Sequence, residues 1–147
     1  MYEYTTRRKI EFVDTDQGGI VHFSRYFIFM ETAEHEFLEA VGTSVDLTLD
    51  DGRHVGWPRV SARCDYKSPA RFGDVLDIRV SVLRKGTKSM TYRIRFSVDG
   101  REVAQGQVSS VCCELTPGRE VKAIPIPDFV AERIEEAPGL EDDTQGF

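Results

Sequence analysis

The chain has 147 residues, a formal net charge of −6, a hydrophobic fraction of 40% and a charged fraction of 30%. These values are typical of one soluble globular domain. An acidic chain lacks the broad basic surface with which proteins bind nucleic acid, so no nucleic-acid partner is expected. No apolar run approaches the length of a membrane span, and the N-terminal residues lack the apolar core of a signal peptide. We therefore expect a cytoplasmic protein with no membrane partner.

The first two predicted elements are a strand and a long helix. Residues 4–14 alternate apolar and polar side chains, which predicts a half-buried strand. Residues 23–41 carry apolar side chains around most of a helical circumference, which predicts a long helix enclosed by the rest of the chain. Ser24 is the expected N-cap of this helix and Gly42 its expected C-terminal stop.

The rest of the chain predicts a meander of strands. After a connection that is expected to hold a helical turn at Val45–Leu49, β-branched and aromatic side chains alternate in four segments. These strands are expected at residues 54–67, 74–85, 89–98 and 102–115. Short turns such as Asp99-Gly100 join them, so their sheet must be antiparallel. A short helix is expected over residues 127–137.

This order of elements predicts an α+β fold in one domain, residues 1–137. An antiparallel sheet of about five strands is expected to wrap the long helix, because nothing else in the chain could cover so much apolar helix surface. Residues 138–147 are acidic and rich in turn formers, which predicts a disordered tail.

The three cysteines do not indicate a disulfide framework or a metal site. Their number is odd, and Cys112 and Cys113 are neighbours whose side chains point to opposite faces of a strand. No spacing resembles a zinc site, so no metal is expected. The simplest interpretation is a reducing compartment, in which Cys64 and the pair are small strand residues rather than nucleophiles.

The chemistry is concentrated between the first strand and the long helix. Asp14 and Asp16 leave the strand, two glycines follow, and the helix then begins. A helix start offers unpaired N–H groups and a partial positive charge that stabilise a developing oxyanion. A neighbouring carboxylate can act as a general base toward water or as a nucleophile toward a carbonyl. Spacing alone favours the alternative, in which both Asp residues are turn and capping residues.

A resemblance to a known family changes this balance. The segment DTDQGGIVHFSRY at residues 14–26 resembles the signature of the hotdog-fold thioesterases of the 4-hydroxybenzoyl-CoA thioesterase type. Two more matches follow in order, YKSPARFGD at residues 66–74 and GREVAQG at residues 100–106. The resemblance implies a hotdog fold, a homodimer with a homotetramer as the alternative, and active sites at the dimer interface.

The resemblance also implies roles for individual residues. The second Asp of the motif, Asp16, is the catalytic carboxylate, and the backbone N–H of Phe23 is the oxyanion donor. His22 is a further candidate, either for catalysis or for lining the pocket, and Gly19 and Tyr26 are expected to contact the substrate. The thioester carbonyl is attacked by Asp16 itself, which gives a mixed anhydride, or by water that Asp16 activates.

The expected substrate is an acyl thioester of coenzyme A, with acyl carrier protein as the alternative carrier, and no separate cofactor is expected. Arg84, Lys85, Lys88 and Ser89 form a basic cluster at a strand turn, where the resemblance places the nucleotide. The alternative is a solvated hairpin tip. Glu31 and Glu34 could face the site, since another hotdog lineage uses a helix glutamate, but this motif carries Asp16, and helix carboxylates are usually solvated.

Two other functions are compatible with this fold. A hotdog protein can bind an acyl thioester without hydrolysing it, and Asp16→Asn would distinguish the two functions. A hotdog dehydratase would need a His with an acidic partner in a different local motif, which the chain does not contain. The identity of the acyl group is left open.

Overall fold

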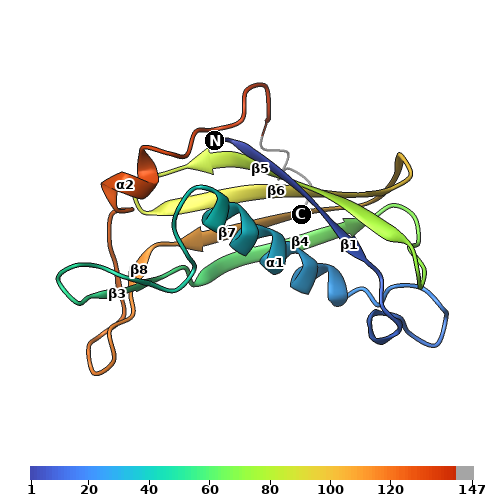
Figure 1. Ribbon diagram of the computed structural model, residues 1–147, viewed down its shortest axis with the longest axis horizontal. Helices are drawn as coiled ribbons and strands as arrows, with labels where there is room; N and C mark the ends of the chain where they lie inside the picture. Colours follow the sequence, from blue (N-terminus) through green and yellow to red (C-terminus); the bar gives the residue numbers. More distant parts are fainter. Residues whose placement is uncertain (142–147) are drawn as a thin grey trace.

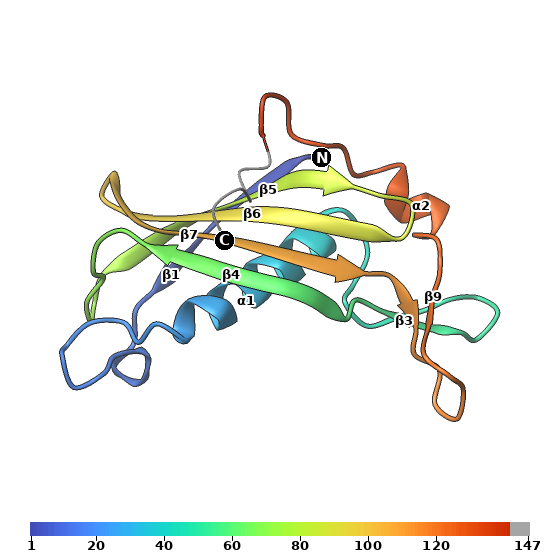
Figure 2. The same cartoon turned by 180° about the vertical axis from the view of Figure 1, so that it is seen from behind.

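A long helix lies across one face of a curved antiparallel sheet in the computed structural model, which describes residues 1–141 (Figure 1). The helix is α1, Arg25–Ala40. The sheet has five strands in the order β1-β5-β6-β7-β4, and its other face is turned to the viewer in Figure 2. Its strands are β1 (Glu3–Lys9), β4 (Arg59–Tyr66), β5 (Val75–Lys85), β6 (Ser89–Val98) and β7 (Arg101–Val111). The predicted α+β architecture is confirmed.

The period-two alternation of the strands places one set of side chains against α1. Ile94 on β6 lies opposite Val80 on β5 and Gly106 on β7, and this row faces the helix. Gly106 allows the closest approach, since a Cβ added there would lie 2.1 Å from Met30 Sδ. A side chain at this position would therefore displace the Met30 thioether from its contact with the sheet.

The predicted long helix is confirmed, with ends one or two residues inside the expected range. At its C-terminus, Gly42 has a φ of +88°, and its N–H donates to the Glu39 carbonyl at 3.0 Å. The N–H of Thr43 donates to the Leu38 carbonyl at 3.0 Å, which completes a Schellman cap. Ser24 occupies the N-cap position, but its side chain makes no capping hydrogen bond.

A second, smaller sheet was not expected. It contains β2 (Leu47–Thr48), β3 (His54–Gly56), β8 (Cys113–Glu114) and β9 (Lys122–Ala123), in the order β2-β3-β8-β9. The predicted helical turn at Val45–Leu49 is wrong, because β2 pairs there with β3. The predicted strand 54–67 is divided at Trp57-Pro58, since proline has no N–H for a strand ladder. The predicted strand 102–115 is divided at Cys112.

The ends of the chain also differ from expectation. The first strand stops at Lys9 and is followed by a 3-10 turn, η1, Phe12–Asp14. The C-terminal helix α2 is only Asp128–Ala131. Of the predicted tail, residues 142–147 lie outside the described residues, and the carbonyl of Glu141 accepts a hydrogen bond from Arg93 Nη2 at 2.6 Å.

All three cysteines are free thiols, as expected. Burial raises the pKa of both Cys64 and Cys112 to about 11, so neither is a ready nucleophile. In the described part of the chain, no helix has the length and apolar character needed to cross a membrane.

Candidate active site

The two carboxylates of the motif occupy different environments. Asp14 is 1% exposed, and its Oδ1 accepts hydrogen bonds from Arg25 Nε at 3.0 Å and Nη2 at 2.8 Å. Its Oδ2 accepts from the Glu11 N–H at 2.9 Å, and its carbonyl accepts from the His22 N–H at 2.9 Å. Asp14 thereby ties the end of η1 to the first turn of α1, which is a structural role.

Asp16 lies on the outside of the same loop. Its Oδ1 accepts the Gly18 N–H at 2.8 Å, and its own N–H donates to the Ile20 carbonyl at 2.9 Å, so the carboxylate is held in a tight turn. Its Oδ2 makes no hydrogen bond to any residue between 1 and 141. Gly19 has a φ of +77° with open space around its Cα, which leaves the approach to the loop unobstructed.

His22 and Phe23 connect this loop to the helix. Nδ1 of His22 lies 2.7 Å from Ser24 Oγ and accepts the Ser24 N–H at 3.3 Å. The Phe23 side chain is 62% exposed, and its backbone N–H donates to no group in the described part of the chain. An unengaged N–H therefore stands just before α1.

The second motif, residues 66–74, contacts the first motif, residues 14–26, and holds it in place. Tyr66, at the end of β4, donates its hydroxyl to the Phe23 carbonyl at 2.9 Å, and the Val21 N–H donates to the Ala70 carbonyl at 2.8 Å. Tyr66 was not among the predicted site residues, although it opens the second motif. These contacts attach the loop to the sheet edge and fix the position of the helix start.

Tyr26, predicted to contact the substrate, is only 3% exposed. Its ring packs edge-on against Tyr66 at 5.4 Å and Phe96 at 5.3 Å, between centroids. Burial raises its pKa to about 12, so the hydroxyl stays protonated at neutral pH. In this structure Tyr26 is therefore buried in an aromatic cluster with Tyr66 and Phe96.

The predicted basic cluster does not converge on one point. Lys85 Nζ donates to the carbonyls of Ala131 at 3.0 Å and Ile134 at 2.8 Å, so it holds the C-terminal segment. The Lys88 side chain instead lines a hollow of about 580 Å³. Arg84 is exposed, and the Ser89 carbonyl closes the turn by accepting the Gly86 N–H at 2.8 Å.

A buried ion pair was missed by the sequence reasoning. Glu34, expected to be solvated, is 1% exposed, and its Oε2 accepts a hydrogen bond from Arg59 Nη2 at 2.5 Å. Ser110 Oγ lies 3.5 Å from its other oxygen, and Glu31 lies 3.7 Å from Arg59 on the outside. Burial raises the pKa of Glu34, although Arg59 opposes this. The periodicity of the helix was the available signal, because Glu34 falls on the same face as Met30 and Leu38.

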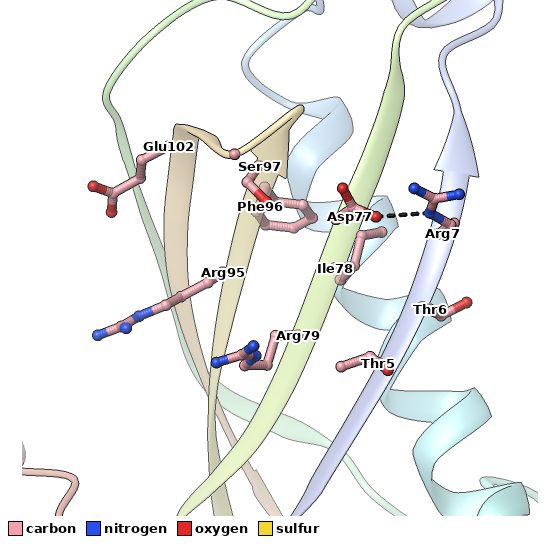
Figure 3. A pocket seen from close by; sticks show the side chains of 11 residues that line it. Thr5, Thr6, Arg7, Asp77, Ile78, Arg79, Arg95, Phe96, Ser97 and Glu102 are labelled. Carbon is pink, nitrogen blue, oxygen red and sulfur yellow. Dashed lines mark hydrogen bonds and ion pairs between the residues drawn. The ribbon is translucent and has the colours of Figure 1, made fainter.

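A separate pocket of about 800 Å³ lies over β1, β5 and β6 (Figure 3). Arg79 and Arg95 stand opposite each other across two paired strands, and Arg7 is paired with Asp77 at 2.7 Å. None of its lining residues belongs to the loop before α1, so its volume does not identify the catalytic site. Within residues 1–141, no group of three His, Cys, Asp or Glu side chains is placed to hold a metal ion.

Comparisons with known proteins agree with this architecture. The profile of the thioesterase-like superfamily matches residues 10–134. A 1,4-dihydroxy-2-naphthoyl-CoA hydrolase from Synechococcus elongatus is 30% identical over 114 residues, which cover 78% of this chain and 84% of the relative. The structure of a gentisyl-coenzyme A thioesterase is 28% identical with a TM-score of 0.75, over 88% of this chain and 98% of that one.

A more distant solved structure shares the fold. It is a 4-hydroxybenzoyl CoA thioesterase, 23% identical with a TM-score of 0.78, and the match covers 90% of this chain and 99% of that one. Together with the family match, it confirms the predicted hotdog fold.

Proposed function

Because this chain belongs to the thioesterase-like superfamily, we propose that it is an acyl-CoA thioesterase that acts on hydroxylated aromatic acyl groups. The observation that carries the proposal is the contrast between the two carboxylates of one loop. Asp14 is buried and fully engaged with Arg25, whereas Asp16 is exposed and keeps Oδ2 available. A carboxylate that has no structural partner at that atom is suited to react with a substrate.

Asp16 attacks the thioester carbonyl or removes a proton from the attacking water. In the first route the Asp16 oxygen bonds to the carbonyl carbon, the thiolate leaves, and water then hydrolyses the mixed anhydride. In the second route, water adds directly and Asp16 receives its proton. Both routes end with the free acid and the thiol. A thiolate leaves readily at neutral pH, so neither route needs a strong general acid.

The backbone N–H of Phe23 stabilises the oxyanion that develops on the carbonyl oxygen. This N–H is unengaged within the described residues and stands at the positive end of a 16-residue helix. Tyr66 fixes the same peptide segment through the Phe23 carbonyl. His22 lies beside it, and its Nδ1 is engaged by Ser24.

The aromatic character of the substrate is supported by the surface and by the relatives. The rings of Phe23 and Tyr66 are 62% and 46% exposed next to the loop, and aromatic walls favour a flat aromatic acyl group. Two of the relatives are named a 1,4-dihydroxy-2-naphthoyl-CoA hydrolase and a gentisyl-coenzyme A thioesterase, and both names describe hydroxylated aromatic acyl groups.

A hydrolysis screen tests this function. The purified chain is incubated with gentisyl-CoA, 1,4-dihydroxy-2-naphthoyl-CoA, benzoyl-CoA, hexanoyl-CoA and palmitoyl-CoA, and thiol release is measured. We expect kcat/KM for the hydroxylated aromatic substrates to exceed that for the aliphatic ones by at least about tenfold, a difference of 1.4 kcal/mol in transition-state binding. Faster hydrolysis of aliphatic substrates would refute the substrate class, and binding without turnover on every substrate would favour the non-catalytic alternative.

The active unit is a homodimer formed along β4. This strand is at the edge of the five-stranded sheet, so one row of its backbone N–H and C=O groups has no partner strand among residues 1–141. Its Val60 side chain is 66% exposed. Antiparallel pairing of two β4 strands would satisfy the open edge and continue the sheet across two copies.

Val60→Glu is expected to weaken this dimer, because it places a charge where the two edges meet. Val121→Glu is the matched control, since Val121 is 62% exposed but lies on the hairpin between β8 and β9. Sedimentation velocity of both variants and the wild type measures the outcome. We expect a rise of at least about tenfold in the dimer dissociation constant for Val60→Glu alone. A monomeric wild type, or equal behaviour of the two variants, would exclude this interface.

A further inference from the structure

A hollow of about 260 Å³ lies on the outer face of the five-stranded sheet, which is the face turned away from α1. Its floor carries Arg79 on β5 and Arg93 and Arg95 on β6, which alternate with the side chains that face the helix. The chain after α2 returns along this face and roofs the hollow, since the Ala137 N–H donates to the Val82 carbonyl at 2.8 Å (Figure 2). Strand pairing alone brings these arginines together, so no sequence motif indicates them.

The sheet places like charges side by side in this hollow. Arg79 and Arg95 are direct partners in the antiparallel pair of β5 and β6, an arrangement that destabilises a sheet (Figure 3). Arg93 is two residues from Arg95 on the same face and is only 5% exposed. Glu3 is the one carboxylate that lines the hollow within residues 1–141. Three cations and one anion leave a local charge of +2 in a chain of net charge −6.

Arg79 and Arg95 are available to a ligand. The Arg95 guanidinium makes no ion pair or hydrogen bond within residues 1–141. Arg79 Nε lies 3.7 Å from a Glu3 carboxylate oxygen, and the two side chains are 58% and 40% exposed, so water screens this pair. Arg93 Nη2 donates to the Glu141 carbonyl at 2.6 Å, which fixes the buried guanidinium beneath the roof. An exposed pair of like charges beside a fixed guanidinium favours a bound anion.

The chemistry of the lining selects a dianion attached to a small apolar body. Guanidinium groups offer planar forks of N–H donors that match the oxygens of a phosphate group. A phosphate monoester carries about −1.5 to −2 charges at pH 7, which offsets the local charge. Tyr2, Pro138 and Leu140 complete the wall beside the arginines and offer apolar surface to the rest of the ligand. We propose that this hollow binds a small phosphate monoester.

The hollow is separate from the catalytic machinery. None of its lining residues belongs to the loop before α1 or to the turn between β5 and β6. Val80 and Ile94 face the helix, whereas their neighbours Arg79 and Arg95 face the other side of the sheet. The inference therefore does not depend on the proposed function, and the ligand is a second molecule rather than part of the thioester.

Titration calorimetry of the full chain with phenyl phosphate tests the hollow. The wild type is compared with Arg79→Gln, Arg95→Gln and a matched control, Lys9→Gln, which removes one exposed positive charge from β1 outside the hollow. All titrations use one buffer and one ionic strength, because salt screens exposed charges. We expect each arginine variant to raise Kd about tenfold, the low end of the range for a hydrogen bond to a charged group, and the control to leave it unchanged. Equal Kd values for all four proteins, or a wild type that binds nothing, would overturn the proposal.

Two further ligands define the chemical class. Inorganic phosphate is expected to bind more weakly than phenyl phosphate, because it lacks the apolar body. Benzoate is also expected to bind more weakly, because it carries a single negative charge. Inorganic phosphate that binds as tightly as the ester would reduce the hollow to a site for the free ion. Benzoate that binds as tightly would refute the preference for a dianion.

Kinetics on thioesters separate this hollow from a role in binding the substrate. Arg95→Gln is expected to leave KM unchanged for one acyl group carried on coenzyme A and on N-acetylcysteamine, which lacks the nucleotide. A rise in KM on the coenzyme A substrate alone would assign Arg95 to the coenzyme and contradict a separate site. If the wild type binds phenyl phosphate through these arginines but hydrolyses no thioester, the hollow stands and the proposed function fails.

Discussion

Asp16→Asn is expected to lower kcat for thioester hydrolysis by about 10²- to 10⁴-fold, which is the usual range for loss of a positioned general base. The amide can still accept the Gly18 N–H through its carbonyl oxygen, so the turn that holds the side chain should survive. The asparagine amide is neither a nucleophile nor a base, so both proposed catalytic routes are lost. Thiol release under substrate saturation measures the effect, and circular dichroism confirms the fold.

Asp14→Asn is the matched control, since it makes the same change two residues away. Asp14 is buried against Arg25, and loss of its charge should lower the free energy of unfolding by about 1.5–3 kcal/mol. Asp16, being exposed, should show almost no such loss. If Asp16→Asn keeps more than a tenth of wild-type kcat, or only Asp14→Asn loses turnover while both remain stable, the assignment of the catalytic carboxylate is wrong.

Arg59→Ala is expected to lower the free energy of unfolding at pH 7 by about 3–5 kcal/mol, because it leaves the buried Glu34 charge without its partner. Arg59 is on edge strand β4 and Glu34 is on α1, so the pair joins the helix to the sheet edge. Urea denaturation followed by fluorescence measures the loss. Glu31→Gln is the control, because Glu31 is half-exposed and lies 3.7 Å from the same guanidinium. Its effect should stay within about 0.5 kcal/mol.

The loss caused by Arg59→Ala should also depend on pH. Burial raises the pKa of Glu34 above its ordinary value of 4.5, so the folded state holds this proton at a pH where the unfolded state has released it. Stability from this group is therefore full below about pH 4.5 and falls as pH rises through the folded-state pKa. Removing Arg59 takes away the cation that opposes the shift, so the folded-state pKa should rise further. The difference between variant and wild type should thus shrink toward pH 5 and grow toward pH 8. A difference that does not change with pH would show that Arg59 acts through packing alone.

Local patterns predicted most of the fold because they were strong and continuous. Residues 23–41 carry apolar side chains around most of the helix, and these are stable only when the rest of the chain covers them. This pattern predicted both ends of α1 to within two residues. The small sheet was missed because β2 has only two residues and is defined by its pairing with β3. The local sequence of β2 fits a helical turn equally well, and its pairing with β3 makes it a strand.

The site was only partly predictable for a related reason. Spacing alone could not separate Asp14 from Asp16, because the difference is the contact between Asp14 and Arg25, eleven residues away. Resemblance selected Asp16, and the burial of Asp14 now gives a physical reason in its favour. Lys85 and Lys88 look equivalent on one turn, yet Lys85 donates to the carbonyls of Ala131 and Ile134, whereas Lys88 lines the same hollow as Lys122. No local pattern joins Lys88 to a residue 34 positions later.

Met30 on α1 packs closely against Gly106 on β7, and this is a close contact between the helix and the sheet. Met30 is five residues, or about 7.5 Å of helix rise, from the first residue of α1. A side chain at position 106 would displace the Met30 thioether, so that the contact between α1 and β7 would have to repack. A displacement of about 1 Å between reacting groups can cost about 10²-fold in rate. The absence of a side chain at Gly106 thus allows α1 to pack closely on the sheet near the Phe23 N–H that is proposed as the oxyanion donor.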